Sequence, residues 1–393
     1  MKFPIWLPGF LGVLSAIGPM STDMYLPAFP AIEAGLNAGP GSVQITLAAY
    51  FLGLAVGQIT QGTLSDRYGR RWPLAIGMIV YTLATIGCAL TPSLLGLSIM
   101  RGLSAFGGSA SGVITRAIVR DLAEGHAAAR IMSKMMLVMG VAPIMAPTVG
   151  SLVLGVWGWQ AIFWVCAAYG GICLLGVLFL LPETLPEARR IKLGFTAQIS
   201  RYIQVMGERG FITNTMMGGM AMFGMFAYLA GSPSVFIRTF GLPPSSYGFL
   251  FGACASGFIL ASQINPRLLH RFGTQAISRV SMRVMLVATL SMAMIAFAGY
   301  ATWPLVALGV LFAMSSQGFT MPNATVGAMA RHAAHAGSAS ALMGTLQFCL
   351  AGVSGLLVGL LDDGTARPMA GLMFLGALGA NIAEHYRPRV KTS

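Results

Sequence analysis

Charged residues are scarce in this sequence. They make up 9% of the 393 residues, whereas a soluble domain usually carries about 25%, and hydrophobic residues make up 56%, with a mean hydropathy of +0.75. Such a chain has too few polar side chains to cover a surface that faces water. The composition excludes an ordinary water-soluble protein and predicts one that is surrounded by lipid.

The sequence also lacks the residue patterns of a metal centre, a disulfide framework or an enzyme active site. Its five cysteines all fall inside apolar runs without the spacing of metal ligands, and its five histidines lie in loops or in the tail. No nucleophile and base stand in the pattern that nucleophilic catalysis requires. We therefore expect packing roles for the cysteines, no enzymatic activity, and no bound metal or cofactor.

Twelve long apolar runs dominate what remains. Most approach the ~20 residues that cross ~30 Å of hydrocarbon as a helix, so they predict an all-α membrane protein with twelve transmembrane helices. Met1 and Lys2 before the first run also resemble a signal peptide, but the run carries Asp23 as its only charge and continues past any plausible cleavage point, so an uncleaved first span is expected. The runs are 5–28, 42–63, 73–91, 94–115, 135–155, 160–181, 212–232, 246–264, 284–300, 303–324, 339–361 and 366–384.

Basic residues are distributed unevenly between the two sides that these spans define. If both termini are cytoplasmic, the outer loops keep only Arg238 and Arg367, and every other lysine or arginine outside the spans lies inside. This asymmetry follows the positive-inside rule and predicts a multi-pass membrane protein with both termini in the cytoplasm. The net charge of +13 then reflects loops that face an anionic leaflet, and no nucleic-acid partner is expected.

One long polar interval, residues 182–211, divides the chain into halves. It predicts an N-terminal six-helix bundle over 1–181, a cytoplasmic linker loop over 182–211 and a C-terminal six-helix bundle over 212–393. Within the interval, residues 195–206 form either a short amphipathic helix on the membrane surface or a solvated linker.

The two halves also resemble each other as a weak repeat. A shift of 204 residues lays Leu64 on Leu268 and Arg67-Tyr68-Gly69 on Arg271-Phe272-Gly273, and each triplet follows the second span of its half. Duplicated halves with a substrate site between them near mid-membrane are a recurrent transporter architecture. The repeat therefore predicts two pseudo-symmetric bundles.

The segment between the second and third spans carries the densest polar pattern in the chain. With Leu64, it matches every specified position of G-x-L-x-D-R-x-G-R-R through Gly62, Asp66, Arg67, Gly69, Arg70 and Arg71. Together with the layout of six plus six spans, this pattern is similar to the hinge signature of the major facilitator superfamily, and the resemblance covers the whole chain. An ordinary basic loop turn is the alternative.

The chemistry of this segment follows from its position. Gly62 is expected to let the second helix approach a neighbour closely. Asp66 lies at the C-terminal end of that helix, where the helix dipole disfavours a carboxylate, so it needs Arg70 or the N-terminus of another helix. The eleventh span begins near Ser338 and Ser340 on the same side. The resemblance implies a contact there that forms when the protein opens outward and breaks when it opens inward.

Two ionisable residues lie inside the predicted spans. Asp23 lies roughly 27 Å from the start of the first helix and Arg101 about 11 Å from the outer end of the fourth, so they share a similar depth. An intramembrane ionisable residue is a functional candidate with a partner, and burial and a nearby arginine act in opposite directions on the protonation of a carboxyl. The alternatives are that Asp23 caps the first helix and that Arg101 reaches the outer interface.

Local sequence further resembles the Bcr/CflA branch of drug:proton antiporters, which is known for bicyclomycin and chloramphenicol resistance. The matching segments are 21–30, 116–121, 322–324 and 337–341. The resemblance implies that Asp23 carries the proton and that Arg101 tunes it. Some relatives have a second acid deeper in the first helix, whereas the matching depth here is near Ser15, so one acid serves the N-terminal half.

Three further residues follow the fourth span. Arg116, Arg120 and Asp121 are expected to form an inner charge cluster that bears on the conformational gate.

The fifth span contains two prolines four residues apart. Pro143 and Pro147 each remove a backbone hydrogen bond, while Gly140 and Gly150 allow bending and close packing. The segment resembles the antiporter motif of the superfamily, which occurs in exporters, but it has Ala146 before the second proline and Ser151 where a second glycine is common. A generic kinked membrane helix is the alternative.

Substrate contacts are less clearly marked than these motifs. Aromatic and polar side chains suit a cavity wall, and 26 methionines suit adaptable walls or a lipid-facing surface equally well. The cavity candidates, each of which is equally a candidate for packing, are Tyr25, Tyr50, Phe226, Tyr228, Asn323 and Gln347.

Taken together, these features favour a proton-coupled multidrug efflux transporter that exports small amphipathic compounds or antibiotics by alternating access. Its partners are the substrate, protons and the lipid bilayer, its energy source is the proton gradient, and a monomer is expected. An importer, a symporter or a metabolite exporter of the same fold is the alternative, and a non-transporting sensor that uses the 182–211 loop is a third hypothesis.

Overall fold

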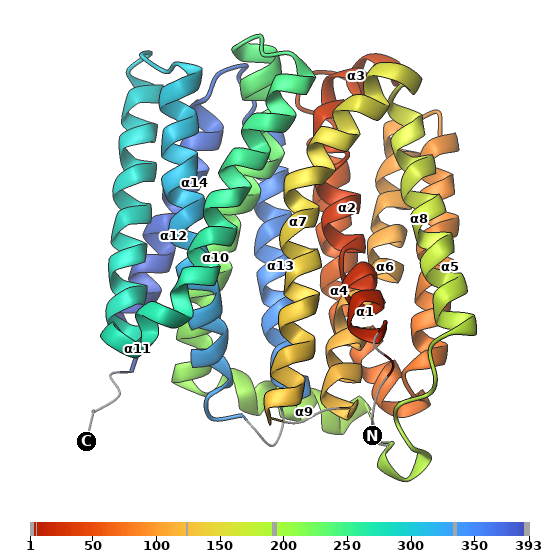
Figure 1. Cartoon of the computed structure of the whole chain (residues 1–393). Coiled ribbons are helices and arrows are strands. Elements are labelled where there is room, and N and C mark those ends of the chain that lie inside the picture. Colours follow the sequence, from red (N-terminus) through yellow and green to blue (C-terminus); the bar gives the residue numbers. More distant parts are fainter. Residues whose placement is uncertain (1–3, 5, 123–124, 191–194, 333–335, 389–393) are drawn as a thin grey trace. The chain divides into compact units, whose positions relative to one another are not determined.

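The computed structural model describes residue 4 and residues 6–122, 125–190, 195–332 and 336–388. For some residues between 125 and 140, and for 189, 195–199 and 336–337, it describes the backbone and not the side chain. Within these ranges every regular element is a helix, which confirms the predicted all-α class (Figure 1). Seven of the described helices are long and apolar enough to cross a membrane, and residues Val141–Trp157 form a shorter apolar stretch. The chain folds into two compact units.

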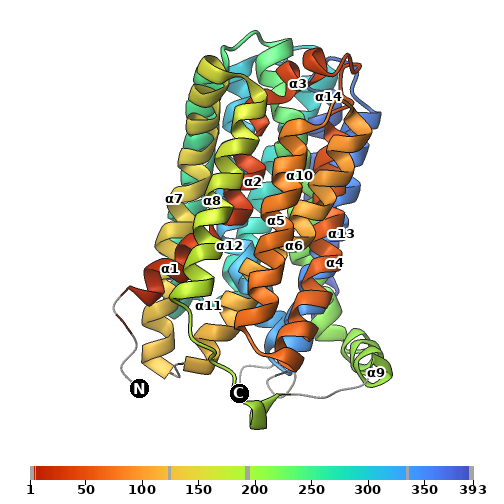
Figure 2. The ribbon, with the colours of Figure 1, turned by 90° about the vertical axis from the view of Figure 1, so that its right-hand side faces the viewer.

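Unit 1 comprises residues 1–38 and 45–195. Figures 1 and 2 show its long helices running side by side, with the first span broken into short pieces. The break between the first two pieces falls at residue 16. Pro19 has no N–H, so it cannot donate the helical hydrogen bond to the carbonyl of Ser15, four residues before it. The elements of the first span are α1 (Leu7–Ser15), α2 (Ile17–Asp23), η1 (Leu26–Ala28) and α3 (Phe29–Gly35). The long helices are α4 (Gln44–Tyr68), α5 (Arg71–Leu90), α6 (Leu94–Leu122), α7 (Gly125–Trp157) and α8 (Trp159–Phe179).

A continuous apolar core holds unit 1 together. Leu11 and Leu14 of α1, Met78 and Tyr81 of α5 and Ile114 of α6 are fully buried in one cluster. Burial of such side chains stabilises a packed interior through dispersion contacts, even where the surrounding solvent is lipid. This core keeps the short helices of the first span, and hence Asp23, inside the unit.

Unit 2 comprises residues 39–44 and 196–393. Two of the predicted spans, 246–264 and 284–300, lie on either side of Gly273 within α11, where the backbone is not helical (φ +73°) and one helix ends and the next begins. The elements after α8 are η2 (Glu187–Arg189), α9 (Phe195–Met206), α10 (Arg209–Ser232), η3 (Pro233–Thr239), α11 (Pro244–Phe297), α12 (Trp303–Met329), α13 (Ala336–Leu360) and α14 (Arg367–His385).

The segment 195–206 forms the short helix α9, and of the two alternatives for it the helix is the one found. Val205 is buried in a cluster with Phe211 of α10 and Leu342 of α13, while Ile203 is exposed. One face of α9 therefore packs on unit 2 and the other is left open, as an amphipathic helix requires.

The internal repeat appears as the same turn built twice. Gly69 and Gly273, which the shift of 204 residues aligns, both adopt positive φ, at +95° and +73°. Just before each glycine an arginine lies over the neighbouring ring, Arg67 at 5.4 Å from the Tyr68 centroid and Arg271 at 5.3 Å from the Phe272 centroid. A glycine is needed at both places because other residues rarely adopt this conformation.

Candidate functional site

Asp23 closes α2, at the point where the first span leaves the α-helix. Its side chain is only 6% exposed, and the Thr22 hydroxyl donates a hydrogen bond of 2.8 Å to its Oδ1. The chain then passes through the short turn η1 to α3. The carboxyl group thus lies at a helix end, but inside the unit and not at its rim.

Arg101 of α6 lies in the same region and is also buried, at 2% exposure. Its Nη1 donates to the Ser21 carbonyl at 2.8 Å, and its guanidinium carbon lies 4.5 Å from the Tyr25 ring centroid and 4.1 Å from that of Tyr50. A guanidinium is attracted to an aromatic face, most strongly where water is excluded. Arg101 is therefore held between two rings and does not extend to the interface.

Asp23 and Arg101 are neighbours without being partners. Arg101 contacts the residue two before Asp23, yet no ion pair joins the two side chains within the described part of the chain. Nε and Nη2 of Arg101 are buried and have no hydrogen-bond partner among the described residues. The cluster can therefore exchange a proton or accept a polar ligand atom without first breaking an ion pair.

The proline-containing helix α7 packs directly on the segment that carries Asp23. A Cβ placed on Gly150 would overlap the Met24 carbonyl oxygen and lie 2.8 Å from its carbon, so only glycine permits this approach. Pro143 and Pro147 both lie inside α7, and the Ser151 hydroxyl donates to the Pro147 carbonyl at 2.8 Å. The packing around Gly140 lies outside what the structure describes.

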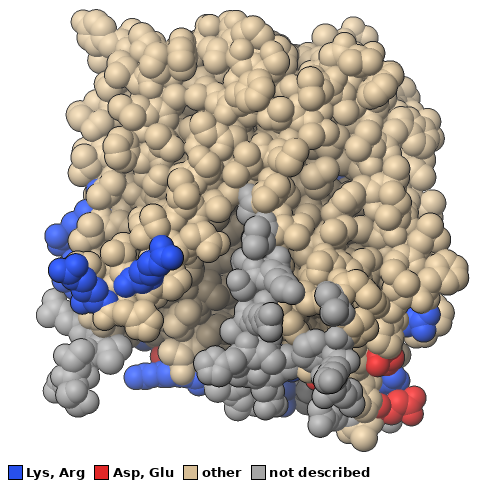
Figure 3. All heavy atoms as spheres, viewed as in Figure 1, with Lys and Arg blue, Asp and Glu red and all other residues tan. Residues whose placement is uncertain are grey.

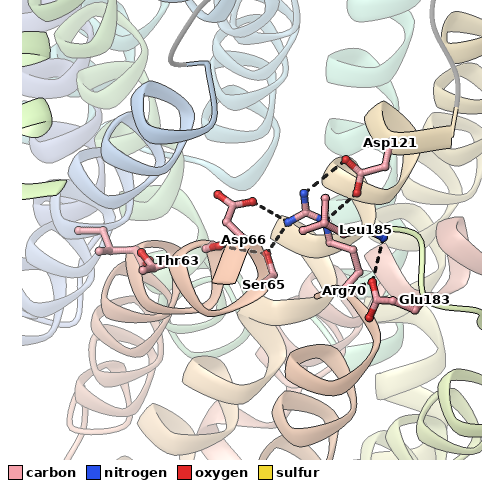
Figure 4. Close-up of polar contacts among 9 residues, drawn as sticks. Thr63, Ser65, Asp66, Arg70, Asp121, Glu183 and Leu185 are labelled. Atoms are coloured by element: carbon pink, nitrogen blue, oxygen red, sulfur yellow. Dashed lines mark hydrogen bonds and ion pairs between the residues drawn. The ribbon is translucent and has the colours of Figure 1, made fainter. Parts of the chain in front are cut away.

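The 62–71 turn forms a network of charges around Arg70 (Figure 4). Arg70 donates from Nη1 to Asp66 at 2.6 Å and to the Ser65 hydroxyl at 3.0 Å, and from Nε and Nη2 to the two oxygens of Asp121 at 2.7 and 3.3 Å. Glu183 accepts from the backbone N–H groups of Arg70 and Arg71 at 2.8 and 3.2 Å. Of the two partners foreseen for Asp66, Arg70 is the one present in unit 1.

The network determines the protonation of its members. Burial alone would lower the pKa of Arg70, but Asp121 and Asp66 outweigh it and raise that pKa. Burial would likewise raise the pKa of Glu183, but hydrogen bonds from the N–H groups of Arg70, Leu185 and Arg71 outweigh it and lower that pKa. Arg70 and Glu183 are therefore charged at neutral pH.

The two glycines of the turn differ in what they do. A Cβ on Gly62 would meet Val113 at 3.6 Å, an ordinary contact, so the expected close helix approach at Gly62 is not needed. Gly69 has positive φ, and a Cβ there would overlap the Glu183 carboxylate and lie 2.8 Å from its carbon. The backbone constraint of this motif thus lies at its second glycine.

Not all the charges predicted at the inner ends of unit 1 meet. Asp121 joins Arg70, whereas the side chains of Arg116 and Arg120 are exposed on α6. Arg67 is also exposed, and Arg71 donates to the Leu178 carbonyl at the end of α8.

The cavity candidates divide between the units. Tyr25 and Tyr50 flank Arg101 and so belong to the Asp23 cluster, while Phe226 and Tyr228 are buried on α10. In unit 2, the Tyr228 ring stacks on Phe251 at 5.5 Å, and Gln347 of α13 packs against α10 at Gly218.

Asn323 has a different role from the one expected. It is buried and exchanges amide hydrogen bonds of 3.3 Å with Asn265, which joins α12 to α11. The reciprocal pair uses one N–H and one acceptor site of each amide, so Asn323 holds two helices of unit 2 together.

A family model described as Major Facilitator Superfamily matches residues 11–356. The chain belongs to this superfamily. The match includes residues of both units, and the charge network around Arg70 and the buried Asp23 both lie in unit 1.

Curated relatives in the superfamily match nearly the whole chain. An uncharacterised MFS-type transporter of Bacillus subtilis is 33% identical over 95% of this chain and 93% of its own length. The multidrug resistance protein D of Escherichia coli is 31% identical over 92% and 90%. The bicyclomycin resistance protein homolog of Haemophilus influenzae is 29% identical over 93% and 92%.

Solved transporters of the superfamily share the fold. The xylose transporter XylE of E. coli, in a partially occluded inward-open conformation, superposes with a TM-score of 0.74 at 14% identity over 98% of both chains. A bacterial homologue of the human lysosomal transporter Spinster gives the same score at 14% identity over 97% of this chain and 95% of its own.

Sequence reasoning missed several residues of these sites. Glu183 lies in the 182–211 interval, and nothing in the sequence marks it as a partner of the 62–71 turn. An acid that reaches the N-terminus of α5 is favoured by the helix dipole. Ser21 and Tyr81, whose hydroxyls are 2.7 Å apart, fix α2 on α5 beneath the Asp23 cluster. Neither contact is visible without knowing which helices are neighbours.

Proposed function

We propose that this protein is a proton-coupled multidrug efflux transporter. The observation that carries the proposal is the buried Asp23, which lies beside an arginine that pairs with aromatic rings instead of with the carboxyl group. Burial of an acid inside a membrane protein is energetically costly, and an acid found there is therefore a candidate for a role in transport. The names of two relatives, a multidrug resistance protein and a bicyclomycin resistance protein homolog, support export as the direction.

Asp23 is the proton carrier in this proposal. A proton entering from outside neutralises Asp23 and releases the substrate outward, and substrate binding from inside favours the deprotonated form. Because Arg101 is already held by Tyr25, Tyr50 and the Ser21 carbonyl, its positive charge stays in place throughout the cycle. The contact between Gly150 and Met24 gives α7 a direct path to sense the change.

The network around Arg70 is the inner gate in this proposal. The side chain of Asp66 is 37% exposed while that of Arg70 is 3% exposed, so Asp66 keeps surface for a second partner. That partner is the start of α13, near Ser338 and Ser340, with the contact formed in the outward-open state and broken in the inward-open state. Arg116 and Arg120 belong to the same side of unit 1.

The remaining features are assigned as follows. The proton gradient is the energy source and no cofactor takes part. The substrate is a small amphipathic compound received by aromatic and amide side chains, with Tyr25, Tyr50, Phe226, Tyr228 and Gln347 as the candidates. The protein works as a monomer in the bacterial inner membrane with both termini in the cytoplasm, which the basic inner loops support.

Accumulation of compounds in cells tests this function. The chain is expressed in a bacterial host that lacks its own pumps, and a panel of antibiotics and dyes is screened for resistance. We expect lower accumulation of at least one compound with the wild type, and none of this effect with Asp23→Asn at equal membrane levels. The matched control is Asp363→Asn, the same change on an exposed loop. Accumulation that rises on expression would show an importer instead.

A further inference from the structure

Unit 2 contains a cavity at the ends of its helices, on the side that the sequence predicts to be cytoplasmic. Two adjoining hollows of about 630 and 420 Å³ share Gln275, Arg279, Arg387 and Pro388 as walls. The larger one reaches the start of α10, the turn of α11 and the end of α12, and the smaller one reaches the end of α14. We call the two together the α11–α14 cavity.

Positive charge exceeds negative charge in the α11–α14 cavity. Its walls include Arg279, Arg283, Arg331 and Arg387, against two acids, Glu208 and Glu384. Both acids already have partners, because Glu208 accepts from the first N–H groups of α10 and lies 3.5 Å from Arg331, and Glu384 lies 3.6 Å from Arg279.

Arg387 forms no ion pair with the described acids, since the carboxylate of Glu384 lies against Arg279. Nη1 of Arg387 is buried and has no hydrogen-bond partner among the residues that the structure describes. Burial lowers the pKa of Arg387, and the charge of Glu384 offsets this only in part. A buried guanidinium in this condition is stabilised by an added anion.

The repeat shows where such an anion would lie. In unit 1 the Glu183 carboxylate, which follows α8, accepts from the backbone at Arg70 and Arg71 beside the positive-φ Gly69. In unit 2 a Cβ on the aligned Gly273 would meet no other described residue within 4 Å beyond its chain neighbours, and the segment after α14 brings Arg387 in place of an acid. Gln275, which the shift aligns with Arg71, lines the cavity. In unit 1 the carboxylate of Glu183 is the anion at this turn, whereas in unit 2 the equivalent place beside Gly273 is open to an anion from outside the chain.

Apolar side chains continue outward from the arginines. Phe272 and Val326 line the cavity and are exposed, and Val280 and Val284, which neighbour Arg279 and Arg283 along α11, are exposed as well. Figure 3 shows blue side chains gathered at the lower left over α11, below an uncharged surface. Basic groups below an exposed apolar helix face match the polar and apolar parts of a phospholipid.

We propose that the α11–α14 cavity binds the phosphate of an anionic phospholipid from the inner leaflet. The phosphate lies against Arg387 and Arg283, and the acyl chains lie along the exposed valines of α11. A soluble phosphate ester offers the same anionic group, but it has no use for the apolar face. The cavity is separate from the Asp23 cluster and from the network around Arg70.

Lipid binding to the purified protein tests the proposal. The full-length chain is delipidated in a neutral detergent and titrated with phosphatidylglycerol or phosphatidylcholine, and retained lipid and the Tm are measured. We expect phosphatidylglycerol to be retained and to raise the Tm, and phosphatidylcholine to do neither. Each loss of an arginine, in Arg283→Gln and in Arg387→Gln, is expected to weaken retention about fivefold, equivalent to about 1 kcal/mol.

The matched control is Arg271→Gln, which removes an exposed arginine of α11 that does not line the cavity and is expected to leave retention unchanged. Arg283 is itself exposed, so its replacement keeps the fold even if Arg387→Gln proves unstable. Equal retention of both lipids, or equal retention by the wild type and Arg283→Gln, overturns the proposal. Protection of the wild type by glycerol phosphate to the same extent as by phosphatidylglycerol overturns the lipid as the source.

Discussion

Arg101 carries a full positive charge in a place from which solvent is almost excluded. Among the described residues its guanidinium donates one hydrogen bond, to the Ser21 carbonyl, and the faces of Tyr25 and Tyr50 provide the remaining stabilisation. Cation–π contacts contribute about 2 kcal/mol or more when they are desolvated. The position of Arg101 in the fourth span predicted a functional residue, but the two rings come from different elements and no spacing in the sequence joins them.

Replacement of Arg101 by lysine tests the role of its shape. Lysine keeps the charge but has no planar group to lie between two rings and donate to Ser21 at once. We expect Arg101→Lys to reach the membrane and to lose most of the efflux measured as cellular accumulation. Arg271→Lys, at an exposed position, serves as the control. Efflux by Arg101→Lys at the wild-type rate would show that charge alone suffices.

Glu183 stabilises the turn at the start of α5 through its charged form. Its pKa is lowered in the folded protein, so its contribution is present above the pKa of an unfolded glutamate, about 4.3, and is lost as the pH falls through the lower folded value. Because the side chain is exposed, the effect is modest.

The prediction for Glu183 is a pH-dependent difference in Tm. Purified Glu183→Gln is expected to have a lower Tm than the wild type at neutral pH, and the difference is expected to shrink as the pH falls below about 4. Exposed Glu187→Gln, from the same segment, is expected to show no comparable difference. A gap in Tm that widens on acidification would refute the assignment.

At the scale of elements, α7 is fitted to the segment around Asp23 by one glycine. The sequence predicted that the glycines of the fifth span allow close packing, but not which neighbour they contact. The structure shows that Gly150 meets the backbone of Met24, next to the proposed proton carrier. That contact is the physical route by which we propose that α7 responds to a change at Asp23.

Two alanine substitutions on α7 separate packing from helix propensity. Gly150→Ala adds a methyl group into the Met24 carbonyl and is expected to destabilise unit 1 by about 1–3 kcal/mol and to reduce efflux. Gly155→Ala, on the same helix with no atom within 4 Å of its Cβ, is expected to be neutral or slightly stabilising. Thermal unfolding in detergent and cellular accumulation measure both, and similar behaviour of the two variants would contradict the packing role.

The turn between α4 and α5 makes a further distinction within one motif. Gly69→Ala forces a Cβ into a positive-φ position against Glu183, and we expect a loss of about 1–2 kcal/mol or more. Gly62→Ala makes only an ordinary contact with Val113, and we expect it to be tolerated. The prediction is checked by comparing the membrane level, the Tm and the efflux of the two variants. A defect in Gly62→Ala alone would contradict it.

The sequence predicted most elements but not their interruptions. The run 5–28 is largely apolar, so the sequence predicts one continuous span. In the structure it is divided into α1, α2 and η1. The spans 246–264 and 284–300 are separate helices, as predicted, because the backbone between them leaves the helical conformation at Gly273. Hydropathy reports that a segment lies in lipid, but breaks within it depend on local backbone hydrogen bonding.

At the scale of the whole molecule, the repeat and the charge distribution could be predicted from the sequence. The different surroundings of the two repeated turns could not. The shift of 204 residues predicted two equivalent turns, and Gly69 and Gly273 confirm them. What surrounds those turns differs, since acids surround Arg70 in unit 1 and arginines line a cavity in unit 2. Such differences depend on helix ends that are distant in the sequence, so only the fold brings them together.

Transport into proteoliposomes tests the central claim, that Asp23 couples substrate movement to protons. Wild type and Asp23→Asn are reconstituted into liposomes with an acidic lumen, and uptake of a compound identified in the resistance panel is followed with a pH-sensitive dye trapped inside. The wild type is expected to accumulate the compound while protons leave the lumen. Asp23→Asn is expected to exchange labelled for unlabelled compound but to show neither accumulation nor proton movement. Accumulation by Asp23→Asn at the wild-type level, with the same proton efflux, would contradict the account.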